Sequence, residues 1–145
     1  MNQTQRQLVK MLSAAVRKKQ VKFSQGERIN WPALVEEAKE HKVSALVYSA
    51  VKNEIDDLRI EMMLLKEWKC EVILSGVNQS NHVKQVSKLL QSFNDNDIPV
   101  IILKGMVLRS LFPNPDFRTM SDVDILVHEE DLERIKTLLL DLNFS

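Results

Sequence analysis

Apolar residues recur at helical spacing over one unusually long segment of the chain, residues 56–93. Because an α-helix turns by about 100° per residue, these residues share one side of the helix: Leu58, Met62, Leu65, Val72, Gly76, Val83, Val86, Leu90 and Phe93. At about 1.5 Å per residue, an unbroken helix of this length spans more than about 50 Å. The sequence therefore predicts one long helix unless it breaks near Gly76, where the missing side chain would let another backbone approach closely.

The residues before this segment also predict helices. Residues 3–19 carry apolar side chains at helical spacing, and residues 20–30 form a polar connection. Asn30 is suited to cap the next helix, since its side chain can accept from a free backbone N–H, and Pro32 is tolerated in a first helical turn. We expect that helix to end near His41, and a short, very apolar helix to follow within residues 43–53 and to pack deeply.

The pattern changes after Ile98, and the rest of the chain predicts strands alternating with helices. The runs 99–103 and 123–127 both predict short buried strands. Residues 106–112 predict a short helix between them, residues 113–116 a turn with two prolines, and residues 129–142 an amphipathic helix. We therefore expect a predominantly helical α+β chain, with a helical domain over residues 1–95 and a β-α-β-α region over residues 96–145.

Composition narrows the classes of function. The 145 residues are 44% hydrophobic and 28% charged, as in a globular protein, and the net charge of zero does not favour nucleic-acid or membrane binding. We interpret the basic cluster Arg17, Lys18, Lys19 and Lys22 as a solvated helix end. The single cysteine, Cys70, excludes an internal disulfide and a cysteine-rich zinc site. No apolar run has the length of a membrane span and the first residues do not resemble a signal peptide, so we expect a cytoplasmic protein.

Two carboxylates stand at the start of the second predicted strand. Asp122 and Asp124 are two residues apart, so in a strand they would point to the same face, with Cα atoms about 7 Å apart. Carboxylates this close repel each other and resist removal from water, which a cation would relieve. Mg²⁺ prefers oxygen ligands and is usually held by one or two carboxylates plus phosphate oxygens, so the pair predicts a magnesium site. The alternative is a capping role at the strand start, with Asp124 accepting from backbone N–H groups.

The turn after the first strand, at Lys104 and Gly105, predicts a phosphate-binding role. A glycine lets the backbone approach a ligand, and free N–H groups at the start of the following helix favour phosphate. Lys104 is either a phosphate contact or a solvated lysine at a strand end. Arg118 either binds phosphate or pairs with Asp122 or Asp124 to hold the loop, and for a chain without metal we favour the pairing.

These motifs stand in one stretch, ILKGMVLRSLFPNPDFRTMSDVDILVHEEDLERIKTLL. It resembles an uncharacterised bacterial nucleotidyltransferase family whose signature is L-K-G-x-x-L, then Y/F-P-x-P-x-x-R, then D-x-D-x-L-V. That family belongs to the polymerase-beta-type nucleotidyltransferase superfamily. Residues 31–51 resemble the helical lead-in of the family, so the similarity spans roughly residues 31–144.

The resemblance implies a role for each of the five residues. Asp122 and Asp124 match the catalytic, metal-binding carboxylates, and Gly105 matches the glycine of a turn that usually reads Gly-Ser or Gly-Gly. Lys104 belongs to the family variant of that turn, and Arg118 matches the arginine before D-x-D. Superfamily members transfer a nucleoside monophosphate from an NTP to a hydroxyl or similar acceptor. They use two Mg²⁺ ions, for which Mn²⁺ is a possible substitute, and a third carboxylate on a later strand.

The chain stops one helix after the D-x-D strand. We therefore expect the N-terminal part of a longer nucleotidyltransferase, with a partial polymerase-beta-type fold, an unknown acceptor, and weak or no activity as this chain alone. Two alternatives stay open: a degenerate nucleotide- or metal-binding module, and a helical interaction protein without catalysis. Because a two-stranded sheet leaves unpaired edges and the long helix offers a second surface, we also expect a homodimer or a higher oligomer, formed through the sheet edge, the long helix or both.

Overall fold

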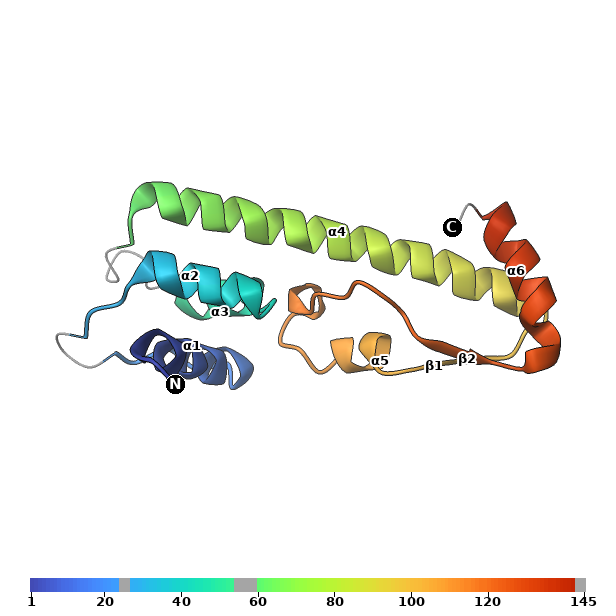
Figure 1. Cartoon of the computed structure of the whole chain (residues 1–145), viewed down its shortest axis with the longest axis horizontal. Coiled ribbons are helices and arrows are strands. Elements are labelled where there is room, and N and C mark those ends of the chain that lie inside the picture. Colours follow the sequence, from blue (N-terminus) through green and yellow to red (C-terminus); the bar gives the residue numbers. More distant parts are fainter. Residues whose placement is uncertain (24–26, 54–59, 143–145) are drawn as a thin grey trace.

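The computed structural model describes residues 1–23, 27–53 and 60–142, and it is a predominantly helical α+β fold, as predicted. The elements are α1 (Gln3–Val16), α2 (Trp31–Glu40), α3 (Ser44–Val51), α4 (Met62–Asp95), β1 (Val100–Ile102), α5 (Gly105–Arg109), η1 (Pro115–Phe117), β2 (Ile125–Val127), η2 (Glu129–Asp131) and α6 (Leu132–Asp141). Figure 1 shows α4 running along the molecule, with α1, α2 and α3 beside its first half and the strands beside its second half. Helix α6 lies across the end of α4.

The boundaries of the first two helices follow from local capping. The Asn2 side chain accepts from Gln5 N at 2.8 Å and completes a capping box at the start of α1. Asn30 caps α2 as predicted, accepting from Ala33 N at 3.2 Å, with Pro32 in the first turn. Helix α1 ends at Val16, earlier than the predicted Lys19, because the chain turns out of the helix at Lys18, whose φ is 53°.

A first hydrophobic core forms around Trp68 of α4, which is fully buried. Its indole N–H donates to Ser44 Oγ at 2.9 Å, so the one polar atom of the ring is satisfied. Tyr48 packs edge-on against it, with ring centroids 5.3 Å apart, and Trp31 lies at 6.4 Å in a tilted arrangement. The predicted deep packing of the short helix α3 is confirmed, since five of its eight residues are buried and Val47 and Val51 belong to this core.

A second core forms around Phe93, at the other end of α4. Ile98 and Ile135 are buried with it, and one face of the sheet packs against them. The strands β1 and β2 pair antiparallel, with Val100 opposite Val127 and Ile102 opposite Ile125. Because α4 contributes to both cores, it connects the two halves of the chain.

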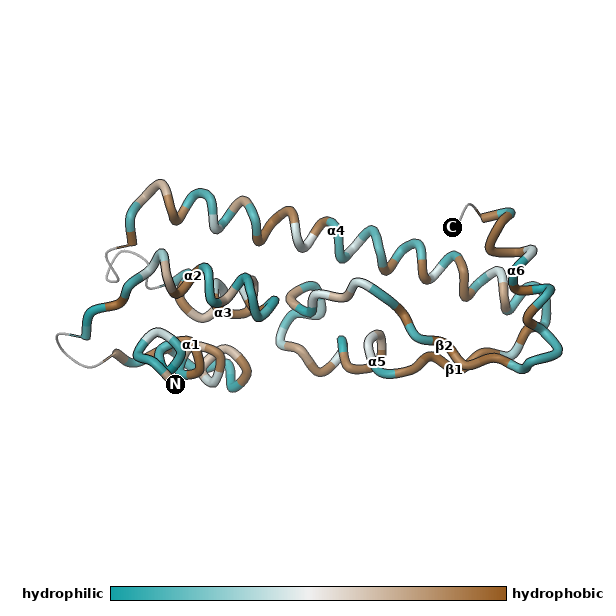
Figure 2. The backbone as a smooth tube through the Cα atoms, in the orientation of Figure 1, coloured by the Kyte–Doolittle hydropathy of each residue, from teal (hydrophilic) through white to brown (hydrophobic). Residues whose placement is uncertain are grey.

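The strands are half-buried, so the prediction of buried strands is wrong for the face that carries Ile101 and Leu126. Ile101 and Leu126 are directly opposite each other in the register and are 60% and 55% exposed. Side chains alternate between the two faces of a strand, and only one face of this sheet is covered by the described residues. In Figure 2 the residues of both strands are coloured mostly as hydrophobic.

Helix α4 confirms the long predicted helix but differs at its start and at Gly76. Of the predicted residues 56–93, residues 56–59 lie outside the described chain, and Ile60 and Glu61 precede the first turn. The helix is unbroken through Gly76, where an added Cβ would meet no described atom within 4 Å, so no other backbone segment of the described chain approaches it closely. None of the described helices combines the length and hydrophobicity that crossing a membrane requires.

An ion pair joins α2 to α4 near the first core. Lys39 Nζ lies 2.8 Å from Glu71 Oε2, and this hydrogen bond raises the pKa of Lys39 above its usual value of 10.5. Since the pKa is higher in the folded state, the pair contributes stability below the unfolded-state pKa of Lys39. That contribution is lost as the pH rises through the folded-state pKa. Both side chains are more than a third exposed, so the contribution is small.

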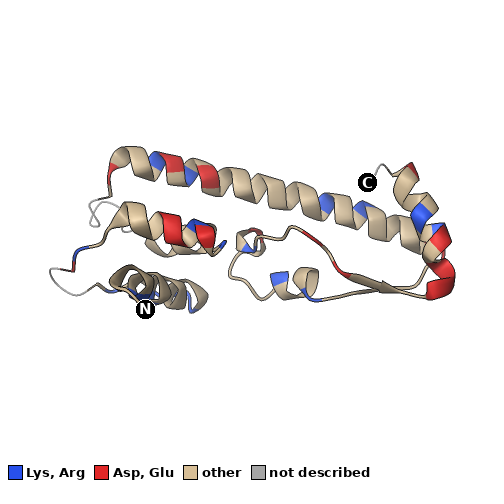
Figure 3. Ribbon diagram, viewed as in Figure 1, with Lys and Arg blue, Asp and Glu red and all other residues tan. Residues whose placement is uncertain are grey.

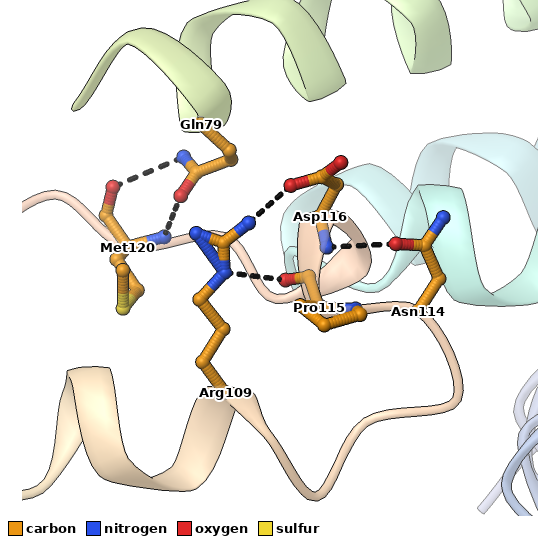
Figure 4. A network of polar contacts seen from close by, with 6 residues as sticks. All are labelled: Gln79, Arg109, Asn114, Pro115, Asp116 and Met120. Carbon is orange, nitrogen blue, oxygen red and sulfur yellow. Dashed lines mark hydrogen bonds and ion pairs between the residues drawn. The ribbon is translucent and has the colours of Figure 1, made fainter. Parts of the chain in front are cut away.

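A buried glutamine links the middle of α4 to the segment that leads into β2. Gln79 Oε1 accepts from Met120 N at 3.0 Å, and Gln79 Nε2 donates to Met120 O at 3.1 Å (Figure 4). Gln79 is 6% exposed and Met120 is 7% exposed. The side chain therefore satisfies both backbone groups of a residue that has no strand partner, and it fixes the distance between α4 and this segment.

We predict that Gln79→Met destabilises the protein by about 2–4 kcal/mol. Methionine has nearly the same shape but leaves the N–H and C=O of Met120 buried without partners, and each such group costs about 1–3 kcal/mol. Urea unfolding followed by circular dichroism measures the change. Gln91→Met on the same helix is the matched control, because Gln91 bonds only an exposed partner, Asp95. Equal effects of the two substitutions would contradict the role assigned to Gln79.

The expected self-association stays a prediction, and the exposed face of the sheet gives it a specific test. We expect Leu126→Lys to reduce the average mass in a dilution series measured by light scattering, because a charge disfavours burial of this face. Leu140→Lys, at an exposed leucine of α6, should leave the mass unchanged. A wild-type chain that is monomeric at every concentration and binds no hydrophobic dye would refute the expectation.

Candidate functional site

The turn between β1 and α5 is formed by a lysine in a strained conformation. Lys104 has φ 34° and ψ −86°, a region that residues other than glycine rarely adopt. The other described residues with positive φ, Lys18, Lys42 and Asp97, directly follow helices, where this conformation is common. Lys104 instead stands between a strand and a helix, and its side chain is exposed. Such strain persists only where the surrounding structure imposes it, and it occurs often at functional sites.

Gly105 follows this turn and faces the segment that leads into β2. A Cβ added at Gly105 would lie 3.5 Å from Met120 Sδ and 3.9 Å from the backbone oxygen of Asp122. Both distances are ordinary van der Waals contacts, so packing alone does not require glycine here. The contact nevertheless establishes that the β1–α5 turn and the Asp122 segment lie side by side.

Asp122 and Asp124 lie before β2 and not within it, so the predicted start of the strand at Val123 is wrong. The ladder extends only as far as Leu103, whose N–H donates to Asp124 O at 2.9 Å. Beyond this point the first strand turns away at Lys104, which leaves Asp122 and Val123 without a ladder partner. Alternation along a strand therefore does not place both carboxylates on one face.

The two carboxylates are exposed and form no ion pair with the described residues. The shortest polar contact of Asp122 is a long one, from Ser121 Oγ at 3.4 Å. The Asp124 carboxylate accepts no hydrogen bond from the described chain, so the alternative that it is satisfied by backbone N–H groups is wrong. Both groups therefore keep oxygens available to a cation from solution.

Arg118 holds the loop by a different contact from the one predicted. Its Nε donates to Gly105 O at 3.3 Å, and its guanidinium carbon lies 5.6 Å from the centre of the Phe112 ring. It makes no ion pair with Asp122 or Asp124, although the pairing was the favoured expectation. The contact with Gly105 brings Arg118 to the same turn as the two aspartates, and its Nη atoms have no partner in the described chain.

A second arginine, Arg109, holds the proline-containing loop in place. Arg109 Nε donates to Pro115 O at 3.0 Å, and its Nη2 forms an ion pair with Asp116 (Figure 4). Asp116 N in turn donates to Asn114 Oδ1 at 3.0 Å. Arg109 is only 9% exposed, and its Nη1 is buried with no partner in the structure. These contacts hold the proline-containing loop in place, in which the short η1 is the regular element.

Neither Gln79 nor Arg109 was predicted from the sequence, and only Gln79 had a recognisable signal there. Gln79 lies three residues after Gly76 and four before Val83, so it is a polar residue on the apolar stripe of the long helix. A buried polar residue needs a partner, which that position could have suggested. Arg109 occupies a short helix with no clear periodicity, so its burial depends on the loop folding back over it.

The five predicted site residues thus belong to the β1–α5 turn and to segments whose backbone or side chain contacts it. Lys104 and Arg118 supply two positive charges, and Asp122 and Asp124 supply two negative charges, which Figure 3 shows as a red stretch leading into β2. Two carboxylates can bind a hard cation, and a lysine and an arginine can bind phosphate oxygens. Within the described ranges, no three or more His, Cys, Asp or Glu residues form a group that could hold a metal.

Comparison with known families places the chain in one of them. The family model described as "uncharacterised nucleotidyltransferase" matches residues 27–145, a range that contains the turn and both aspartates. No curated protein and no solved structure matches the chain. The matched range covers most of the 145 residues, so the chain belongs to this family of uncharacterised nucleotidyltransferases.

Proposed function

We propose that the chain binds an NTP with Mg²⁺ at the β1–α5 turn and takes part in transferring the nucleoside monophosphate to an acceptor. The observation that carries the proposal is the placement of Asp122 and Asp124. Both are exposed, neither is in an ion pair, and both lie against the turn formed by Leu103, Lys104 and Gly105. The family assignment supplies the class of reaction.

The donor atoms fit magnesium. Mg²⁺ takes oxygen ligands, often from one or two carboxylates, and completes its shell with water and substrate phosphate oxygens. Asp122 and Asp124 supply the carboxylates, and Mn²⁺ would be accepted by the same ligands. Two exposed carboxylates alone form a weak metal site, so binding should improve when the triphosphate contributes ligands. Bound metal would neutralise charge on the phosphates during transfer.

The remaining site residues are placed to hold the triphosphate. Lys104 presents an exposed ammonium group at the turn, and Gly105 adds no side chain between the backbone and a ligand. Arg118 uses Nε on Gly105 O, which leaves its two Nη groups for phosphate oxygens. In this proposal Arg118 both holds the turn and binds the substrate, because the two roles use different atoms of one guanidinium group.

Phosphoryl transfer depends mainly on positioning and on electrostatic stabilisation. The residues described here provide these for the nucleotide, through a fixed turn and four charged side chains. A third carboxylate does not join Asp122 and Asp124 within the described part of the chain. We therefore expect binding by the isolated chain to be easier to detect than turnover.

A nucleotide- and metal-binding module without catalysis is the second candidate. The same two carboxylates and the same turn would serve it, and the lack of a third carboxylate among the described residues favours it. Binding experiments do not separate this candidate from an enzyme. Turnover experiments separate them, and a chain that neither binds nor turns over nucleotide would instead be an interaction protein.

The metal site is tested by titration calorimetry with Mg²⁺ or Mn²⁺, with and without ATP. We expect metal binding that is stronger in the presence of ATP, and at least a tenfold loss, about 1.4 kcal/mol, in Asp122→Asn/Asp124→Asn. Asp97→Asn is the control, because it removes an exposed aspartate away from the site. The backbone of Asp97 has a left-handed conformation that asparagine also adopts. Unchanged affinity in the double variant would exclude the assigned ligands.

Turnover is tested with α-labelled NTPs and a mixture of hydroxyl-bearing acceptors. We expect the purified 145-residue chain to transfer label slowly or not at all, because no third carboxylate joins Asp122 and Asp124 among the residues that the structure describes. Transfer at a rate typical of enzymes, about 1 s⁻¹ or more, that disappears in Asp122→Asn would contradict this expectation. It would mean that another group, for example from a second subunit, completes the site.

A further inference from the structure

We propose that a basic cleft between the helical region and the proline-containing loop binds a phosphate-bearing acceptor. The inference rests on the proposed function, because it names the class of acceptor for the same reaction. The cleft has a volume of about 400 Å³ and lies where the ends of α1 and α3 meet the loop before Arg118. Lys18, Lys19 and Lys52 line it, together with Asn114 and Phe117.

The charge of the cleft differs from the charge of the whole protein. The protein has no net charge, but none of the described residues that line the cleft is acidic. None of the three lysines forms an ion pair with a described residue. Like charges gathered in a recess repel one another and attract an anion.

A neighbouring hollow extends the positive surface. It shares Ala14, Lys19 and Gln20 with the cleft and adds Arg17 and Lys22 to its lining. Lys10 also lines this hollow, but its ammonium group is paired with Glu27 at 3.1 Å. An elongated anion could therefore continue from the cleft along the end of α1.

Helix capping does not account for the lysines of α1. Cationic side chains often follow helices because they compensate for free carbonyl groups and the helix dipole. Here the backbone already closes the helix end: Lys18 N donates to Ala15 O at 3.1 Å and Lys19 N donates to Ala14 O at 2.9 Å. The ammonium groups of Lys18 and Lys19 are therefore not needed as caps and remain exposed beside the cleft.

The other wall of the cleft is suited to the organic part of a phosphate ester. Alanines at positions 14, 15 and 50 leave space on the helical side, and Phe117 offers an aromatic surface on the loop side. The Oδ1 of Asn114 accepts from Asp116 N, which leaves the Asn114 amide N–H groups free to donate. A ligand whose phosphate binds the lysines and whose ring packs on an aromatic face would be a sugar phosphate or the end of a nucleic-acid strand.

The loop connects this cleft directly to the proposed nucleotide site. Phe117 lines the cleft, and the next residue, Arg118, donates to Gly105 O at the turn. Arg109 holds the loop through Pro115 O and Asp116, so the wall is fixed in place (Figure 4). A molecule bound against one side of this loop would lie next to the nucleotide site, which is the position an acceptor requires.

The test measures binding of two probes to the full chain by competition and fluorescence anisotropy. The probes are ribose 5-phosphate, compared with ribose, and a labelled single-stranded RNA of ten nucleotides. We expect the wild-type chain to prefer ribose 5-phosphate to ribose. We expect Lys18→Gln/Lys19→Gln/Lys52→Gln to lose at least tenfold in affinity for whichever phosphate probe binds. If RNA binds more than tenfold more tightly than ribose 5-phosphate, the acceptor is a strand end, and otherwise it is a free phosphate ester.

Two controls make the result specific. Lys84→Gln/Lys88→Gln/Lys136→Gln removes the same charge from exposed lysines of α4 and α6 and should retain affinity. Asp122→Asn/Asp124→Asn should lose metal and NTP binding but retain probe binding, so failure of the nucleotide site and failure of the cleft give different results. The proposal is overturned if neither phosphate probe binds the wild-type chain, or if both lysine triples lose the same affinity.

Discussion

The continuity of α4 is the constraint on which both halves of this protein rely. Trp68 and Phe93 are fully buried, belong to different hydrophobic cores and sit on the same helix. At about 1.5 Å per residue they lie roughly 37 Å apart along its axis, too far for the two cores to touch directly. A break near Gly76 would therefore separate the cores. The helix stays intact there because a single glycine costs only about 1 kcal/mol, less than tertiary packing supplies.

The segment between α5 and β2 joins the two proposed sites. It is held in place by side chains and not by regular secondary structure. Between α5 and β2 the chain forms only the short η1, so few backbone groups are paired in ladders or helices. Gln79 binds both backbone groups of Met120, Arg109 binds Pro115 O and Asp116, and Arg118 binds Gly105 O. Each contact satisfies groups that would otherwise be left without partners, which is the condition for burying irregular backbone. The order of this loop thus depends on three side chains from three different places in the sequence.

Although the chain has no net charge, each of its two proposed binding surfaces carries charged side chains that have no ion-pair partner among the described residues. Asp122 and Asp124 have no ion-pair partner in the described structure, and neither do Lys18, Lys19 and Lys52. The loop lies between these groups, with the cleft on one side and the strained Lys104 turn on the other. Unsatisfied charges of opposite sign on either side of one fixed loop suit a reaction that brings together a metal-bound nucleotide and a second anion.

The sequence by itself determined the local elements of the chain. Helical periodicity, the Asn30 cap and the apolar runs are patterns among residues close in sequence, and they predicted the helices and strands to within a few residues. The motifs also singled out the five residues of the proposed site. The detailed contacts were decided only in the tertiary structure. The strand ladder ends at Leu103, so Asp122 lies outside β2, and Arg118 meets Gly105 and not an aspartate. Gln79 bonds Met120 across 41 residues, and the cleft combines residues from α1, α3 and the loop. Periodicity in the sequence does not identify such partners, because they come together only when distant segments of the folded chain pack against each other.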